Sequence, residues 1–285
     1  MNYRYLEESD FDAIYNTFVK AFSDYQVRMK ITKAQFREMN DRRGLNYGLS
    51  VGAFNQDGLM VGLLLSGVDT WKNKRTAYDL GTGVVPEFRR KGVADSMFDF
   101  LLPELRKRGV EQYLLEVIKS NKKAYNLYKK KGFREIRQLE CFSADTSSPN
   151  LSRAAKVDTV IEQMEVPDWP LFESFWDWQP SWQNSTNSMK RCPDKKLILG
   201  AISDNECVGY AILYPESGDI TQIAVDKGQR RQGIGSQLVK RLVEETHKGR
   251  LAILNVDNAA TGTIDFLMRM GFKNFIGQHE MMLNV

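Results

Sequence analysis

Apolar positions along the chain follow helical and strand spacing in a regular succession. In the first half this spacing predicts, in order, helices over 9–23 and 32–43, strands over 48–55, 59–68 and 76–85, a helix over 92–107, a strand over 113–117, a helix over 122–131 and a strand over 133–142. Ser9 or Asp10 is expected to cap the first helix. Asp57-Gly58 is a typical hairpin turn between the first two strands.

The second half of the chain repeats the later part of this order. It predicts strands over 197–202, 208–214 and 220–225, a helix over 233–247, a strand over 251–256, a helix over 260–270 and a strand over 275–283. The small polar stretch SADTSSPN, which begins at Ser143, separates the halves and is typical of a linker. We therefore predict one domain over 1–143, a linker over 144–152 and a second domain over 153–285.

Sequence similarity between the halves supports this division. VVPEFRRKGVA begins at Val84 and VDKGQRRQGIG at Val225, an offset of 141 residues (225 minus 84). LEVIKSNKKAYNLYKKKGF begins at Leu115 and LNVDNAATGTIDFLMRMGF at Leu254, an offset of 139 (254 minus 115). The chain is predicted to contain one unit of about 140 residues twice.

Composition narrows the class of protein. Hydrophobic residues make up 42% and charged residues 27%, which favours a globular protein over a disordered or membrane-spanning one. The N-terminal residues lack the apolar core of a signal peptide, and the three cysteines have no regular spacing, so a cytoplasmic protein without structural disulfides or zinc is expected. The net charge of +4 is too small to indicate a nucleic-acid partner, although the basic excess falls in the first half.

The strongest local signal for chemistry is a basic, glycine-containing turn between a strand and a helix, present in both halves. It reads RRKGVA from Arg89 and RRQGIG from Arg230. The first turn of a helix leaves backbone N–H groups unpaired and positive, and glycine lets a ligand approach them closely. Such a turn suits a phosphate or pyrophosphate, while the alternative is a glycine turn with solvated basic residues. The P-loop spacing from Gly228 to Gly233 lacks the following Lys-Ser/Thr, which excludes a kinase or ATPase of that class.

These motifs resemble the GNAT superfamily of acyl-CoA-dependent N-acetyltransferases. The family signature Arg/Gln-x-x-Gly-x-Gly/Ala is matched at Arg89, Gly92 and Ala94 and again at Arg230, Gly233 and Gly235. The block around LEV at Leu115 and LY…GF at Leu127 is similar to the ribosomal-protein alanine acetyltransferases of that family. The resemblance implies two tandem α/β domains, each a mixed sheet that splays open beside the turn and is flanked by helices. It also implies acetyl-CoA as co-substrate and no metal.

The resemblance assigns residues to the coenzyme. Backbone at Thr82, Gly83 and Val84 would hold the pantetheine arm and polarise the thioester, and Asn121 would bind the same arm. The pyrophosphate would lie on the turn formed by Arg89, Arg90, Lys91, Gly92, Val93, Ala94 and Asp95. Its counterpart in the second half is Arg230, Arg231, Gln232, Gly233, Ile234 and Gly235.

Attack on a thioester needs a neutral amine, and the leaving thiolate needs a proton. Glu116, at a strand end, suits the base, with Asp79 as its rival, and Tyr128 suits the acid. The second half has Asn255 and Leu267 at the positions of Glu116 and Tyr128 (116 and 128 plus 139). We therefore expect the first half to catalyse the transfer by direct attack in a ternary complex. The second half is expected to be a degenerate, structural or coenzyme-retaining domain, although Asp219 leaves activity there open.

The acceptor is expected to be a primary amine of a small molecule or peptide. Four of the five tryptophans fall within 169–182, where they form either an acceptor pocket or core packing. His247 and His279 stand without a surrounding set of carboxylates or cysteines in the sequence. The alternatives are a non-catalytic acyl-CoA-binding or assembly module and a transferase acting on protein N-termini or lysines. The sequence leaves a homo-oligomer open and gives no indication of a membrane partner.

Overall fold

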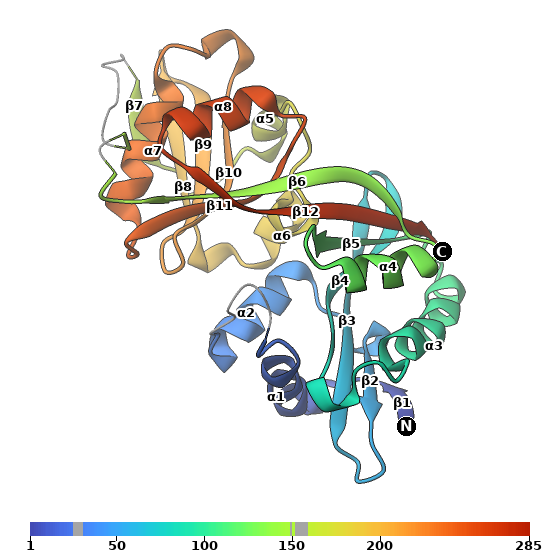
Figure 1. The fold of residues 1–285 in the computed structure, drawn as a ribbon. Coiled ribbons are helices and arrows are strands. Elements are labelled where there is room, and N and C mark those ends of the chain that lie inside the picture. Colours follow the sequence, from blue (N-terminus) through green and yellow to red (C-terminus); the bar gives the residue numbers. More distant parts are fainter. Residues whose placement is uncertain (25–30, 149, 152–158) are drawn as a thin grey trace. The chain divides into compact units, whose positions relative to one another are not determined.

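The computed structural model describes residues 1–24, 31–148, 150–151 and 159–285. The chain divides into two compact units, of which unit 1 is Met1–Ile136 with His279–Val285 and unit 2 is Arg137–Gln278 (Figure 1). The predicted linker over 144–152 begins within a strand, and its residues 149 and 152 lie outside the described part. Within the described ranges, no helix has the length and apolar character needed to cross a membrane.

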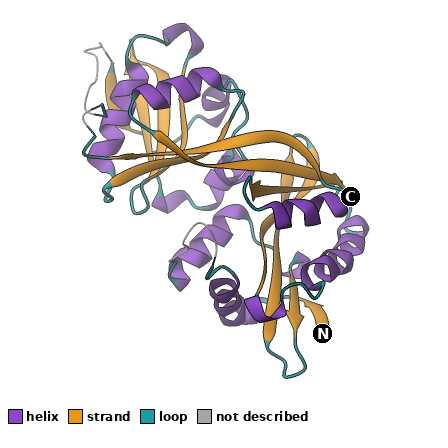
Figure 2. Ribbon diagram, in the orientation of Figure 1, coloured by secondary structure: helices purple, strands orange, loops and turns teal. Residues whose placement is uncertain are grey.

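Unit 1 is a mixed sheet with helices on both faces (Figures 1 and 2). Its elements are β1 (Asn2–Tyr5), α1 (Phe11–Ala21), α2 (Lys33–Arg43), β2 (Val51–Phe54), β3 (Met60–Trp71), β4 (Lys74–Val84), α3 (Val93–Lys107), β5 (Gln112–Ile118), α4 (Lys122–Lys130), the start of β6 (Arg134–Asp145) and the end of β12 (Lys273–Asn284). The strand order is β1-β2-β3-β4-β5-β12. Four strand pairs of this unit have a described register. Of these, β4–β5 is parallel, and β1–β2, β2–β3 and β3–β4 are antiparallel.

Unit 2 repeats this arrangement. Its elements are most of β6, β7 (Val160–Gln163), α5 (Trp169–Ser174), the 3₁₀ turn η4 (Trp182–Asn184), α6 (Thr186–Arg191), β8 (Leu197–Ser203), β9 (Glu206–Tyr214), β10 (Asp219–Val225), α7 (Ile234–Glu245), β11 (Arg250–Asp257), α8 (Thr261–Arg269) and the start of β12. The strand order is β6-β11-β10-β9-β8-β7, and β10 runs parallel to β11. The helices and strands expected from apolar spacing are all present within a few residues of their predicted bounds.

Three local expectations are wrong or incomplete. Asp10 does not cap α1, because its carboxylate instead bonds to Arg4 at 2.7 Å and to the backbone N–H of Glu7. The edge strands β1 and β7 were not predicted, because an apolar alternation over four residues is too short to recognise. The short helices of unit 2 were missed for the same reason, since α5 and α6 have six residues each.

Both sheets open where the two parallel strands separate. In unit 1 the β4–β5 pairing ends at Tyr78 and Leu114, although β4 continues to Val84 and β5 to Ile118. In unit 2 the β10–β11 pairing ends at Ile220 and Ile253, although both strands continue. A bulge accompanies each opening, with Leu80 and Thr221 as the extra residues. The splayed sheet implied by the family resemblance is therefore confirmed in both units.

Strand alternation fixes which side chains reach each face of these openings. In unit 1, Ala77 of β4 and Leu115 of β5 belong to the apolar core beneath α3 and α4. In unit 2, Leu213 of β9 packs towards α7 and α8, whereas Tyr210 packs towards α5 and α6. The sheet of unit 2 is thus buried on both faces.

Candidate active site

The turn before α3, and its counterpart before α7, forms a concave backbone surface. Arg90 and Gly92 have φ of +61° and +75°, and Arg231 and Gly233 have φ of +65° and +96°. Left-handed backbone is strained for arginine, and alternation of this kind points successive N–H groups to one side. Neither α3 nor α7 has a side-chain cap in the structure as described. The first-turn amides are therefore free to bind an anion, as the sequence predicts.

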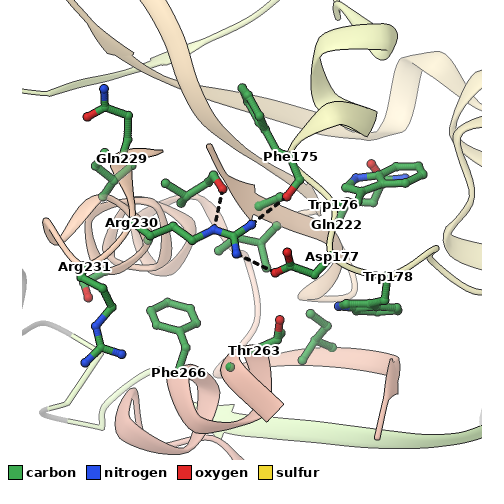
Figure 3. Close-up of a pocket in the computed structure, with 18 of the residues that line it drawn as sticks. Phe175, Trp176, Asp177, Trp178, Gln222, Gln229, Arg230, Arg231, Thr263 and Phe266 are labelled. Carbon is green, nitrogen blue, oxygen red and sulfur yellow. Dashed lines mark hydrogen bonds and ion pairs between the residues drawn. The ribbon is translucent and has the colours of Figure 1, made fainter. Parts of the chain in front are cut away.

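An arginine connects each turn to the C-terminal end of an earlier helix, α1 in unit 1 and α5 in unit 2. Arg89 donates to the carbonyl oxygens of Val84 at 3.0 Å and Ala21 at 2.9 Å, and pairs with Asp24 at 2.6 Å. Arg230 makes the same three contacts with the Val225 carbonyl, the Phe175 carbonyl and Asp177, at 3.0, 2.9 and 2.7 Å (Figure 3). These guanidinium groups are occupied by the protein itself, so their part in the site is to position the turn.

Arg230→Ala should lower the free energy of unfolding by about 2 kcal/mol, because three hydrogen bonds of a charged group are lost together. Thermal or urea unfolding would measure the change. Arg231→Ala is the matched control, since its guanidinium has no partner among the described residues, and a change within about 0.5 kcal/mol is expected. Equal effects of the two substitutions would show that the three contacts of Arg230 do not stabilise the turn.

The two residues predicted to transfer protons lie on opposite faces of the unit 1 sheet. Glu116 accepts a hydrogen bond from the Tyr78 hydroxyl, on the face away from α3 and α4. Tyr128, on α4, packs in the core beneath those helices and donates a hydrogen bond to Asp79. The structure therefore brings Tyr128 together with Asp79 and not with Glu116. A thioester held between the separated strands would have one pair on each side.

Asp79 is buried at the point where β4 leaves β5. Its carboxylate accepts hydrogen bonds from the Thr82 hydroxyl at 2.7 Å and from the Gly81 N–H at 2.8 Å. Burial raises the pKa of Asp79 to about 6, although the bonds from Thr82, Gly81 and Tyr128 oppose this shift. Burial and the charge of Glu116 raise the pKa of Tyr78 well above its usual value. Perturbed groups of this kind, at an opening of the sheet, are typical of functional sites.

The raised pKa of Asp79 predicts a pH-dependent stability. A folded-state pKa near 6, above the ordinary 3.8, means that the folded state binds the proton more tightly. The stabilisation is complete below about pH 4 and is lost as the pH rises through 6, by an amount on the order of 3 kcal/mol. Urea unfolding between pH 4 and pH 8 would measure it against Asp79→Asn, whose profile should lack this component. Parallel profiles would show that Asp79 has an ordinary pKa.

The other residues predicted for the coenzyme site differ in what surrounds them in unit 1. Gly83 lies against α1, where an added Cβ would come within 3.0 Å of Ala21, whereas an added Cβ at Gly92 would meet open space. The Asn121 amide oxygen caps α4 at the N–H of Ala124, 3.2 Å away. The Asp95 side chain pairs with lysines of the α4 end, which lowers its pKa. Lys91 lies over the Phe88 ring, 4.9 Å from its centroid.

Unit 2 contains a cavity of about 520 Å³ beside its turn. Figure 3 shows Arg230 between the turn and Asp177, with Phe266 and Thr263 of α8 on the other side of the arginine from Phe175. Predicted coenzyme residues Arg230 to Gly235 all line this cavity, together with Trp176 and Trp178.

The tryptophan-rich segment is divided between the cavity and the core of unit 2. Trp178 lines the cavity, while Trp182 is buried in unit 2. Trp176 also lines the cavity, but its indole N–H donates to Tyr210 at 2.6 Å. Folding places one glutamate beside each histidine, Glu216 at 2.6 Å from His247 and Glu135 at 2.9 Å from His279.

Three residues of the candidate site, Tyr78, Asp24 and Asp177, could not be predicted from the sequence. Tyr78 was missed because its partner Glu116 is 38 residues away. Asp24 and Asp177 lie 65 and 53 residues before their arginines, so the repeat offset does not connect them.

Comparison with known proteins identifies the class. The profile described as the acetyltransferase (GNAT) family matches residues 11–133 and again 161–272. The chain therefore belongs to this family and contains two of its domains. No curated protein sequence matches the chain.

Solved structures share the whole architecture at low sequence identity. A GCN5-related N-acetyltransferase from Sphaerobacter thermophilus is 17% identical with a TM-score of 0.73, and the match covers 99% of this chain and 95% of that one. A tandem GNAT protein from the clavulanic acid biosynthesis pathway is 14% identical with a TM-score of 0.74, covering 99% and 98%. The glucosamine N-acetyltransferase region of a fungal multi-domain β-N-acetylglucosaminidase is 15% identical with a TM-score of 0.77, covering 99% of this chain and 38% of that one.

Proposed function

We propose that this acyltransferase moves an acetyl group from acetyl-CoA to a primary amine, and that unit 1 performs the reaction. The observation that carries the proposal is two hydrogen-bonded pairs of a tyrosine and a carboxylate, Tyr78–Glu116 and Tyr128–Asp79, on the two faces of one splayed sheet. Unit 2 has Asp219, Asn255, Ile220 and Leu267 at the corresponding positions (offsets 141 and 139).

In this proposal acetyl-CoA supplies the activated acyl group, and the turn from Arg89 to Asp95 holds its pyrophosphate. Backbone beside the bulge, over Thr82 to Val84, provides N–H groups for the developing oxyanion. Asn121, at the start of α4, binds the pantetheine arm in this proposal.

Glu116 accepts the proton from the attacking amine while the N–C bond forms and the C–S bond breaks. Tyr128 gives its proton to the departing sulfur, which leaves an amide and the free thiol of CoA. Asp79 holds the Tyr128 hydroxyl and acts as a positioning residue. Attack is direct in this proposal, because Cys141, Cys192 and Cys207 all belong to unit 2 and unit 1 has no cysteine to form an acyl-enzyme.

The proposal is tested by following CoA thiol release with a panel of amines and identifying the acetylated product by mass spectrometry. Free amines, peptides with a free N-terminus and peptides with only lysine amines separate the acceptor classes. Gly92→Glu should abolish turnover, since the left-handed φ strains the new residue and its carboxylate repels a pyrophosphate. Thiol release that is independent of every amine would contradict the transfer reaction.

A further inference from the structure

Tyr78 of β4 forms a hydrogen bond across the opening of the unit 1 sheet. In the parallel β4–β5 pairing it lies opposite Leu114, and this is the last pair before the strands separate. Glu116 lies two residues further along β5 and therefore on the same face as Leu114. The Tyr78 hydroxyl donates to Oε2 of Glu116. Side chains thus join the two strands just where their backbone pairing ends.

The end of α2 covers Tyr78. Gly67 of β3 lies opposite Tyr78 in the antiparallel β3–β4 register, and side chains of residues paired in this way share a face. A Cβ added at Gly67 would come within 2.6 Å of the carbonyl oxygen of Arg43, the last residue of α2. Tyr78 beside it is only 2% exposed. Close packing restricts a side chain to one rotamer, so the Tyr78 hydroxyl has a fixed position.

Glu116 is less enclosed than the tyrosine that contacts it. It is half-buried, whereas every other residue of β5 is buried. In the proposed reaction Glu116 must be reached by an amine and yet keep its orientation. A carboxylate can accept at both oxygens, so the bond from Tyr78 to Oε2 is compatible with uptake of a proton.

Tyr78 retains its own proton at neutral pH. Burial and the negative charge of Glu116 raise the pKa of Tyr78 well above its usual value. The hydroxyl is therefore a hydrogen-bond donor to the carboxylate and not an acid in the reaction.

The other charged groups around this pair belong to α2, β4 and β12. The charge of Arg43 on α2 lowers the pKa of Tyr78, and the charge of Asp79 on β4 raises it. In β12, the neighbour of β5 in the sheet, Met281 belongs to the core beneath α3 and α4. Alternation therefore places the buried Glu280 on the face that carries Glu116.

We propose that Tyr78 is a positioning residue that keeps Glu116 ionised and oriented towards the attacking amine. A hydrogen bond to a carboxylate stabilises the charged form, and a fixed donor restricts the rotation of the carboxylate. In the transfer step the amine proton goes to Glu116, while Tyr78 keeps its own. The inference rests on the proposed function, because it concerns the base of the same reaction.

Tyr78→Phe in the full chain tests this role, with Tyr113→Phe as the matched control. Tyr113 is also completely buried, and its hydroxyl shares a hydrogen bond of 2.8 Å with the Ser66 hydroxyl. Tyr113 belongs to the core beneath α3 and α4, on the other face of β5 from Glu116. Each substitution thus removes one buried hydroxyl, but only Tyr78→Phe removes a bond to Glu116. Circular dichroism verifies that both variants are folded.

The ionisation of Glu116 is read by carbon-13 NMR of protein labelled at the glutamate side-chain carboxyl carbon. Glu116→Gln identifies the resonance by its absence. Tyr78→Phe should raise the midpoint of this titration by about 1–2 pH units, which corresponds to the loss of one hydrogen bond to a charged group. Tyr113→Phe should leave the midpoint unchanged.

Acetyl transfer provides the second measurement, with the amine of the panel that releases CoA thiol fastest. Tyr78→Phe should lower kcat by about tenfold or more, because the base loses its orientation. The acidic limb of the pH profile should move upward together with the NMR midpoint, while KM for acetyl-CoA stays the same. Tyr113→Phe should show neither change.

The inference is overturned if Glu116 titrates alike in Tyr78→Phe and in the unaltered chain, or if Tyr113→Phe shifts the midpoint equally. Unchanged kcat in Tyr78→Phe would also overturn it. If the midpoint shifts in Tyr78→Phe alone but the unaltered chain acetylates no amine, the proposed function fails, while the control of Glu116 ionisation by Tyr78 stands.

Discussion

Tyr128→Phe should lower kcat for acetyl transfer by about 10²–10⁴-fold, the usual contribution of a positioned proton donor. The hydroxyl is held by Asp79 on the α4 side of the opened sheet, where the sulfur would leave. Phenylalanine keeps the ring contacts with Phe98 and Phe133, at 5.8 and 5.7 Å between centroids, so the core should persist. Steady-state kinetics with saturating acetyl-CoA would measure the loss.

Tyr125→Phe is the matched control on the same helix. Its ring lies against His279, 4.9 Å between centroids, away from Asp79, so the loss of its hydroxyl should leave kcat unchanged. Calorimetry with CoA should give the same affinity for both variants, which separates chemistry from binding. Full activity in Tyr128→Phe, together with inactivity in Gly233→Glu, would move the active site to unit 2.

Removal of residues 279–285 should unfold unit 1 and abolish acetyl transfer. These last residues belong to unit 1 and bury Met281 completely within its core, with Leu283 packed against it. The N–H of Val285 also bonds to the Glu111 carbonyl at 3.0 Å. Loss of a whole core strand approaches the 5–15 kcal/mol of total stability that a domain usually has.

Met281→Ala gives a graded form of the same test. It should lower the free energy of unfolding of unit 1 by about 2–5 kcal/mol, as expected for a buried methionine. Met268→Ala, in unit 2 and 61% exposed, is the control and should change little. Because four of five tryptophans lie in unit 2, fluorescence reports unit 2 while circular dichroism reports the whole chain. Equal shifts of both signals would contradict an effect confined to unit 1.

Much of the fold could be read from local patterns. The helix from Val93 and its counterpart from Ile234 were predictable because apolar spacing and the preceding glycine are local properties. The splay of the sheet was available only through the family resemblance, since no single residue encodes the point where two strands separate. Division of the chain at Ile136, with His279–Val285 returned to unit 1, was not predictable, because it depends on which strands pair.

The candidate site, too, was predictable only where its residues are contiguous in the sequence. The basic glycine turn was found because strand, turn and helix are contiguous in the sequence. The sequence did not predict that Arg89 and Arg230 hold the turns in place. Each guanidinium is bound by a carboxylate more than 50 residues earlier, at Asp24 and Asp177. The sequence predicts Asp79 as a rival base, and the structure places it beside Tyr128.

The sequence alone determined the tandem repeat, the turn in each half and the loss of Glu116 and Tyr128 equivalents in the second half, because these depend on residue identity at fixed spacing. Tertiary structure decided which side chains meet. Strand alternation points Glu116 away from the face of the sheet that α4 covers with Tyr128, and burial at the opening raises the pKa of Asp79 to about 6. It also joins Asn184 of η4 by hydrogen bonds to Gln222 of β10 and to the Leu254 carbonyl oxygen of β11, which are far apart in the chain.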